Sequence, residues 1–224
     1  MADIVCSVVT VAEKLVEAND IERGIFLFRS LTTNPEVALE SHQRACILLR
    51  MAELFLEYTV MIDLAEECIL DAKRSAALGG VDIPVHLRIL QICCVILVNK
   101  KDYVSVSNIA KEGLLIASSK QMNDPNCPYD HWFRLCWLQC CVQLRQFGQV
   151  TSVVSSHSKD HRDDDDFGRL YDAIACHCSM IENELDSAVL KKLQDICPKV
   201  SGTTGTPWSL ACQTYICLLE LLTC

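Results

Sequence analysis

Glycine and proline are scarce in this sequence, whose 224 residues include 8 Gly and 6 Pro. Because half of the residues are hydrophobic as well, a largely disordered chain is excluded and a helix-rich globular protein is favoured. Long hydrophobic runs are also lacking. The apolar segment 4–12 has no basic region before it, and 89–98 is too short and is broken by Gln91. The sequence therefore predicts neither a secretory signal nor a membrane span.

Positively charged residues are fewer than negatively charged ones. Lys and Arg number 20 against 29 Asp and Glu, which gives a formal net charge of -9. Affinity for nucleic acid comes mainly from clustered Lys and Arg, so we expect no direct nucleic-acid binding. Cysteine, by contrast, is abundant: 15 residues are scattered through apolar positions without a secretory signal. We expect reduced thiols that pack in the core of a nuclear or cytosolic protein.

One spacing pattern recurs six times along the chain. Its last copy, Trp208-x2-Ala211-Cys212-x2-Tyr215, fits the opening W-x2-L-G-x2-Y of the tetratricopeptide repeat. A small residue is needed in each copy because the first helix of a repeat packs closely on its second helix. We name these small residues the markers, and they are Ala12, Ala52, Cys94, Cys141, Ala175 and Cys212, at intervals of 40, 42, 47, 34 and 37 residues.

The predicted fold is all-α. We expect residues 1–224 to form a single domain, a right-handed superhelical solenoid of tetratricopeptide-like helix pairs, with turn residues between the pairs. The unpaired last helix would leave an apolar face uncovered, so the chain is expected to be part of a longer solenoid. The expected helices span residues 3–18, 21–32, 36–57, 61–78, 84–99, 102–118, 129–147, 149–157, 166–183, 185–197 and 208–223.

Possible metal ligands have simpler structural explanations. His157 and His161 stand four residues apart beside Asp163–Asp166, but this hydrophilic run lies between predicted helices and favours a solvated loop over a zinc site. Neighbours on a helix such as Cys176 and Cys178 point in different directions, which favours core packing. The sequence shows no phosphate-binding loop, dinucleotide fingerprint or nucleophile elbow. We therefore expect no enzymatic activity, no metal and no cofactor.

A stack of helix pairs presents a concave groove formed by its first helices. In tetratricopeptide proteins this groove is lined by the positions six and three before the marker and one, four and five after it. A mixture of apolar anchors and both signs of charge suits an extended peptide or a helix, whereas the alternative for each position is packing against the next repeat. The candidate groove residues are Leu49, Glu53, Leu56, Glu57, Arg88, Gln91, Val95, Asn99, Leu135, Leu138, Val142, Arg145, Gln146, Arg169, Asp172 and Met180.

The order of segments resembles the N-terminal part of the tetratricopeptide subunit of the cohesin loader, in the sister-chromatid cohesion loading factor family. The likeness lies in VVTVAEKL at 8–15, RACILLRMAELFLEYTVMIDLAEECILDAK at 44–73, PYDHWFRL at 128–135 and SLACQTYICLLELL near the C-terminus. This resemblance implies a nuclear, non-enzymatic protein that wraps an extended segment of a large HEAT-repeat partner of the Nipped-B type. It also implies that the protein reaches cohesin and chromatin indirectly.

Two other helical-repeat functions remain open. A cytosolic co-chaperone would hold a C-terminal carboxylate with Lys, Arg and Asn on adjacent first helices. The candidates are Arg88, Asn99 and Arg145, whose spread over two repeats makes a poor clamp. A scaffold subunit of the proteasome or signalosome type would normally add a winged-helix module, which the sequence does not predict.

Overall fold

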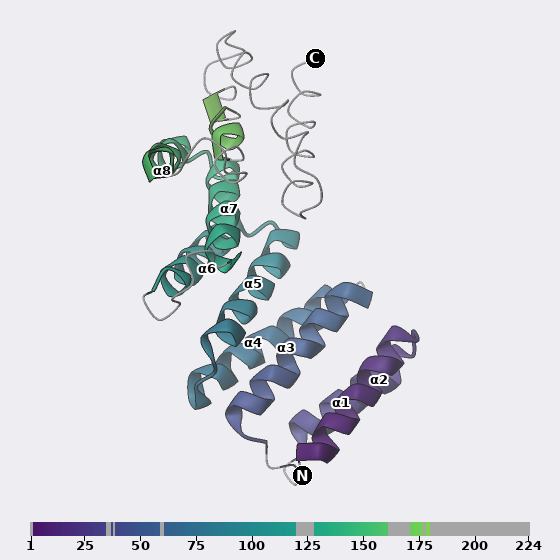
Figure 1. The fold of residues 1–224 in the computed structure, drawn as a ribbon. Helices are drawn as coiled ribbons and strands as arrows, with labels where there is room; N and C mark the ends of the chain where they lie inside the picture. Colours follow the sequence, from purple (N-terminus) through teal and green to yellow (C-terminus); the bar gives the residue numbers. More distant parts are fainter. Residues whose placement is uncertain are drawn as a thin grey trace, which may run out of the picture. The chain divides into compact units, whose positions relative to one another are not determined.

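The computed structural model describes residues 2–34, 37, 39–58, 61–119, 128–160, 171–176 and 178–179, and these residues form helices and turns without a strand (Figure 1). The predicted all-α class is confirmed in this part of the chain. The helices labelled in Figure 1 are α1 (Ala2–Glu17), α2 (Ile21–Thr33), α3 (Ser41–Tyr58), α4 (Ile62–Gly79), α5 (Ile83–Asn99), α6 (Tyr103–Ala117), α7 (Pro128–Gln143) and α8 (Phe147–Asp160). Residues 171–176 and 178–179 are helical as well.

Most helix bounds were predictable. Those of α1, α2, α4, α5 and α6 lie within one residue of the expected positions. The helix α3 starts at Ser41 instead of residue 36, because the Glu40 N–H donates to Gln43 Oε1 at 3.3 Å in the manner of a capping box. Of the later predictions, 185–197 and 208–223 fall outside the described residues.

Close contacts in the chain divide it into two compact units, Met1–Phe133 and Arg134–Cys224, which we name the N-terminal and C-terminal units. In the N-terminal unit, α1 packs on α2, α3 on α4, and α5 on α6. Each later pair also contacts the one before it, since α3 touches both α1 and α2, and α5 touches both α3 and α4. In Figure 1, α3 lies between α1 and α5. This arrangement is compatible with a helical repeat.

The turns within three of the helix pairs share one geometry. Asn19, Lys101 and Arg145 adopt φ values of 66°, 60° and 56°. In each turn the N–H of this residue donates to the carbonyl three residues earlier, and the next N–H donates to the carbonyl five residues earlier. These two bonds define the Schellman motif, which ends a helix within one residue and reverses the chain.

Small residues make the tight helix crossings that the repeat pattern requires. The markers Ala12, Ala52 and Cys94 have no exposed surface. At Gly24 a Cβ atom would stand 2.5 Å from Val16 Cγ2 and 3.0 Å from the Ala12 carbonyl oxygen, so α1 and α2 approach too closely there for any side chain. The predicted close approach at small positions is confirmed for α1 and α2, and the markers Ala52 and Cys94 are buried.

Each unit has its own hydrophobic core. In the N-terminal unit the markers Ala12 and Ala52 join larger side chains such as Phe28 and Phe55. In the C-terminal unit Leu138, Cys141 and Val150 pack with Tyr171 and Ile174. None of the helices in the described part of the chain combines the length and the hydropathy that a membrane-spanning segment requires.

Candidate protein-binding face

The first helices α1, α3 and α5 of the N-terminal unit share one side, which we name the first-helix face. A chain of polar contacts crosses it from helix to helix. We name this chain the ion-pair ladder, and its members are Glu13 on α1, Arg50 and Glu53 on α3, and Arg88 and Gln91 on α5.

The ladder is continuous over three helices. Arg50 Nε donates to Glu13 Oε1 at 2.7 Å, and Arg50 Nη1 lies 3.4 Å from Glu53 Oε2. The second oxygen of Glu53 accepts from Arg88 Nε at 2.6 Å. Arg88 Nη1 then donates to Gln91 Oε1 at 2.7 Å. Glu53 thus joins two arginines from different helices, and its position ties α3 to α5.

Glu53, at the centre of the ladder, is its least exposed charged side chain. The Glu53 side chain is only 17% exposed, whereas Arg88 is 42% exposed. The hydrogen bond from Arg50 to Glu13 is the main reason that the pKa of Arg50 is raised, although partial burial acts against it. A charged hydrogen bond in such a half-buried place is stronger than one between fully exposed groups.

One end of the face carries acidic side chains. Glu17 and Glu57 are exposed, and each stands five residues after its marker. Their negative charges, that of Glu57 foremost, raise the pKa of the neighbouring Tyr58 phenol, with a smaller contribution from burial. No ion pair joins Glu17 or Glu57 to a described Lys or Arg side chain within 4.0 Å. This end of the face is therefore a region of negative potential.

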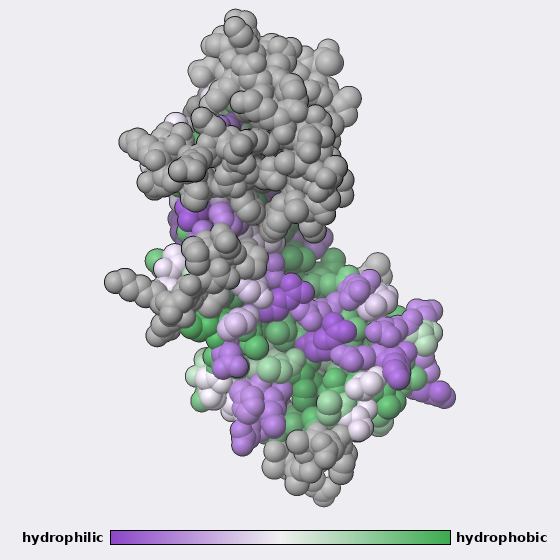
Figure 2. Space-filling view, viewed as in Figure 1, coloured by the Kyte–Doolittle hydropathy of each residue, from purple (hydrophilic) through white to green (hydrophobic). Residues whose placement is uncertain are grey.

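Apolar side chains are interspersed with these charges. Val95 is 36% exposed and Val98 is 42% exposed on α5, while Leu56 is half-buried on α3. The Asn99 side chain donates to the Val95 carbonyl oxygen at 3.0 Å, near the end of α5. Figure 2 shows hydrophilic and hydrophobic surface side by side over α3 and α5. The predicted groove residues on these two helices, apart from Leu49, keep part of their surface accessible.

Three predicted groove residues belong instead to the core. Leu49 and Leu135 are 8% and 7% exposed, and Leu138 is not exposed at all. For Leu138 the reason lies in the following turn. Asn19 and Lys101 come seven residues after their markers, but Arg145 comes only four residues after Cys141. Leu138 lies seven residues before Arg145, as the markers Ala12 and Cys94 lie seven residues before Asn19 and Lys101. Leu138 therefore occupies the buried position of a marker, and the prediction set the marker of the fourth repeat one helical turn too late.

Two other predicted groove residues of the fourth repeat lie beyond the end of α7. The prediction of a helix to residue 147 was wrong, because α7 ends at Gln143. Arg145 and Gln146 are exposed residues of the turn that follows it. Val142 is half-buried against the core of the C-terminal unit.

One of the three predicted groove residues of the fifth repeat lies among the described residues. Asp172 is half-buried in the helical residues 171–176, and Arg169 and Met180 lie outside the described residues.

Glu13 and Arg50 were not among the predicted site residues. Glu13 stands one residue after Ala12, as Glu53 stands one after Ala52, so the repeat template could have found it. Arg50 stands two residues before its marker, a position outside the template, and only the packing of α1 on α3 brings it to Glu13.

The predicted core cysteines lie in the C-terminal unit. Cys176 and Cys178 are 4% and 2% exposed and belong to the core of the C-terminal unit, as predicted. The described residues contain no group of three or more His, Cys, Asp or Glu side chains that could hold a metal ion. His161 and Asp163–Asp166 lie outside the described residues.

The described residues belong to the all-α class, and in the N-terminal unit they form helix hairpins that pack one upon the next. No protein-family model, no curated protein and no solved structure matches the chain.

Proposed function

We propose that this protein is a non-enzymatic scaffold or adaptor that holds an extended segment of a larger protein on its first-helix face. The observation that carries the proposal is the ion-pair ladder, which spans three helices beside partly exposed apolar side chains. A surface of this kind offers apolar contacts to some side chains of a bound segment and polar contacts to others along its length.

The charge of the face defines the chemistry of that segment. Arg50 and Arg88 are already engaged by Glu13 and Glu53 within the ladder. Glu17 and Glu57 remain exposed at one end of the same face. We propose that the bound segment places Lys or Arg near this end and apolar residues near Val95 and Val98, because complementary charge fixes the register of an extended ligand.

The proposed partner is a large HEAT-repeat subunit of the Nipped-B type. Its support is the resemblance of segments 8–15 and 44–73 to the tetratricopeptide subunit of the cohesin loader, together with an all-helical fold that is compatible with such a repeat. In this proposal the helix pairs continue as a right-handed superhelix, the protein acts in the nucleus, and it supports cohesin loading and sister-chromatid cohesion. The partner and cohesin, not this acidic chain, would contact DNA.

Affinity purification of the protein from its own cells at moderate salt, followed by mass spectrometry, tests the proposal. Recovery of a HEAT-repeat protein with cohesin subunits is the expected result. Recovery of chaperones, or of proteasome or signalosome subunits, would keep the scaffold class and reject the chromatin function. A preparation with no stoichiometric partner would reject the scaffold proposal itself.

A further inference from the structure

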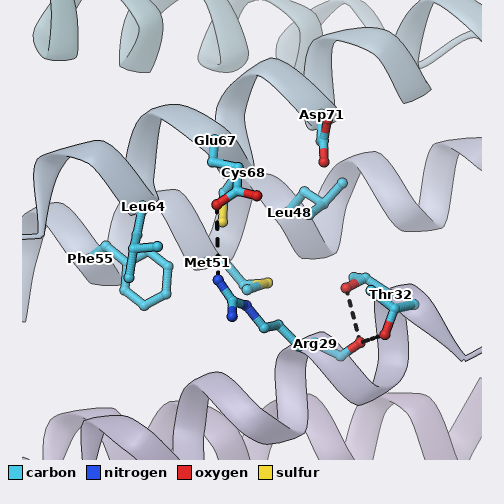
Figure 3. A pocket seen from close by; sticks show the side chains of 10 residues that line it. Arg29, Thr32, Leu48, Met51, Phe55, Leu64, Glu67, Cys68 and Asp71 are labelled. Carbon is cyan, nitrogen blue, oxygen red and sulfur yellow. Dashed lines mark hydrogen bonds and ion pairs between the residues drawn. The ribbon is translucent and has the colours of Figure 1, made fainter.

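A second groove lies between α2 and α4, away from the ion-pair ladder, and α3 forms its floor (Figure 3). Its volume is about 310 Å³. The floor residues are Leu48, Met51 and Phe55, each at most 5% exposed, and Leu64 and Cys68 of α4 continue the apolar lining. The groove exists because α2 and α4 both pack on α3 but not on each other.

The polar groups beside this floor are mostly engaged within their own helix. The Thr32 hydroxyl donates to the carbonyls of Phe28 and Arg29 at 3.1 and 3.3 Å. The Thr33 hydroxyl donates to the Arg29 carbonyl at 2.7 Å. A small polar ligand would therefore find few hydrogen-bond partners here, whereas apolar side chains would find a matching surface.

The rim of the groove has opposite charges on its two sides. Arg29 lies on the α2 side, and Glu67 and Asp71 lie on the α4 side. Arg29 Nη2 and Glu67 Oε2 are 3.9 Å apart across the groove, and both side chains are more than half exposed. Such an exposed pair contributes little to stability, so a ligand that offers better partners can open it.

An exposed aromatic residue extends the apolar surface along α2. Phe26 is 69% exposed and stands three residues before Arg29. Residues three apart lie on the same side of a helix, so Phe26 follows the groove edge one turn beyond Arg29. A large, exposed aromatic side chain beside an apolar groove is typical of a protein-binding surface.

We propose that this groove docks an amphipathic helix of a partner protein. The volume of about 310 Å³ suits a few apolar side chains, so a helix that lies along the groove can place residues spaced three and four apart in it. Charge complementarity defines its flanks: Lys or Arg faces Glu67 of α4, whereas Asp71 is already paired with Arg74 at 2.8 Å, and Asp or Glu faces Arg29 of α2. The site is separate from the first-helix face, so one chain can hold an extended segment and a helix at the same time.

Site-specific photo-crosslinking in the protein's own cells tests this proposal. The full chain carries a benzoylphenylalanine at Thr33, which lines the groove, or at Arg23, an 80% exposed control position on α2 that does not line it. Mass spectrometry then identifies the peptide that is crosslinked. The expected result is one amphipathic helical peptide, with apolar residues at helical spacing and a basic flank, from position 33 but not from position 23.

Charge variants of the rim provide the second part of the test. Glu67→Lys places a cation opposite the basic flank and is expected to lower the crosslink yield at least about tenfold, because like charges placed together in an interface strongly disfavour binding. Glu67→Gln should lower it about threefold. Glu40→Lys, the same change at a 76% exposed position before α3 that does not line the groove, is the matched control and should leave the yield unchanged.

Three results would overturn the proposal. They are the absence of a crosslink at position 33, a crosslinked peptide without an amphipathic pattern or from a second copy of this chain, and an unchanged yield in Glu67→Lys. Thermal unfolding of each variant distinguishes lost docking from lost fold, and Glu67→Gln serves as the test if Glu67→Lys is unstable.

Discussion

The Glu53 carboxylate lies 2.6 Å from Arg88 Nε, although 35 residues separate the two in the sequence. Glu53 follows its marker by one position and Arg88 precedes its own by six, so the contact joins two positions that the repeat pattern had assigned to one surface. It ties α3 to α5 and neutralises a carboxylate that is largely removed from solvent. The same contact thus stabilises the fold and sets the charge of the candidate binding face.

The Glu53–Arg88 pair should contribute measurably to stability. In a double-mutant cycle with Glu53→Gln and Arg88→Gln, we expect a coupling energy of about 0.5–1 kcal/mol, since Glu53 is mostly buried but Arg88 is not. Urea unfolding followed by circular dichroism gives the four free energies. The control is the Asp20–Arg23 pair on α2, which is more exposed and should show almost no coupling. Equal coupling in both cycles would contradict a special role for the ladder.

Reversal of the Arg88 charge should weaken partner binding. Arg88→Glu places a second carboxylate beside Glu53, which breaks the ladder at α5, the feature on which the proposed binding rests. We expect at least about a tenfold loss of co-purified partner with unchanged far-UV circular dichroism. Arg23→Glu, a change of the same charge at an exposed site on α2, is the control. If both variants retain the partner equally, the first-helix face is not the binding site.

Small residues at regular intervals made the helix pairs predictable. Ala12, Ala52 and Cys94 stand among larger apolar residues at helical spacing, and burial of these positions follows from close packing alone. The marker of the fourth repeat was harder to identify, because Leu138 and Cys141 are both apolar and stand one helical turn apart. The turn that distinguishes them has Arg145 in the left-handed conformation, where glycine is the usual signal.

The candidate site was only partly predictable, because its contacts depend on how the helices pack. The repeat template predicted Glu53, Arg88 and Gln91 as groove residues, but it did not predict the hydrogen bonds from Arg88 to the other two. The contact from Arg50 to Glu13 depends on how far α1 is shifted along α3, which is a property of tertiary packing. The groove between α2 and α4 likewise follows from the separation of two helices, and no local sequence pattern records it.

A methyl group at Gly24 should destabilise the first helix pair. Its Cβ would overlap Val16, which is 1% exposed, and would press on the backbone carbonyl of Ala12. The clash is expected to outweigh the better helix propensity of alanine, so Gly24→Ala should cost about 1–3 kcal/mol in urea unfolding. Gly148→Ala on α8 is the matched control, because a Cβ there meets no atom within 4 Å and should be neutral or stabilising. Similar losses in both variants would contradict the close approach of α1 and α2.

The start of α6 should depend on one side chain. Asp102 accepts a hydrogen bond from the Ser105 N–H at 3.1 Å. Hydrogen bonding by the Ser105 side chain, and then by this N–H, lowers the pKa of the Asp102 carboxyl group. A lowered pKa means that the stabilisation is present above the unfolded-state value of about 3.9 and is lost as pH falls through the folded-state value. Asp102→Ala should lower the melting temperature at neutral pH, and Asp102→Asn should lower it less. Asp82→Ala is the control, since Asp82 precedes α5 without a side-chain capping bond. A loss as large in Asp82→Ala would show that the hydrogen bond is not the cause.

Thiol reactivity should separate core cysteines from surface ones. Cys6 and Cys46 are exposed, whereas Cys68 and Cys93 are buried. Burial is the main cause that raises the pKa of Cys68 to about 12 and that of Cys93 to about 11. At about pH 8 very few of these buried thiols are ionised, so iodoacetamide followed by mass spectrometry should label Cys6 and Cys46 before Cys68 and Cys93. Early labelling of Cys68 in the folded protein would contradict its place in the core.

The same thiols should make the fold sensitive to alkaline pH. Because the folded-state pKa values of Cys68 and Cys93 exceed the unfolded value of about 8.5, their contribution to stability is complete below that pH and is lost as pH rises towards 11–12. Near pH 10 each thiol should lower the free energy of unfolding by about 2 kcal/mol, measured by urea unfolding. The variant Cys68→Ala is less stable at neutral pH because it leaves a cavity, yet its stability should fall less steeply between about pH 8.5 and 10. Parallel pH profiles for the two proteins would mean that Cys68 ionises as readily in the folded chain as in the unfolded one, which burial in an apolar core does not allow.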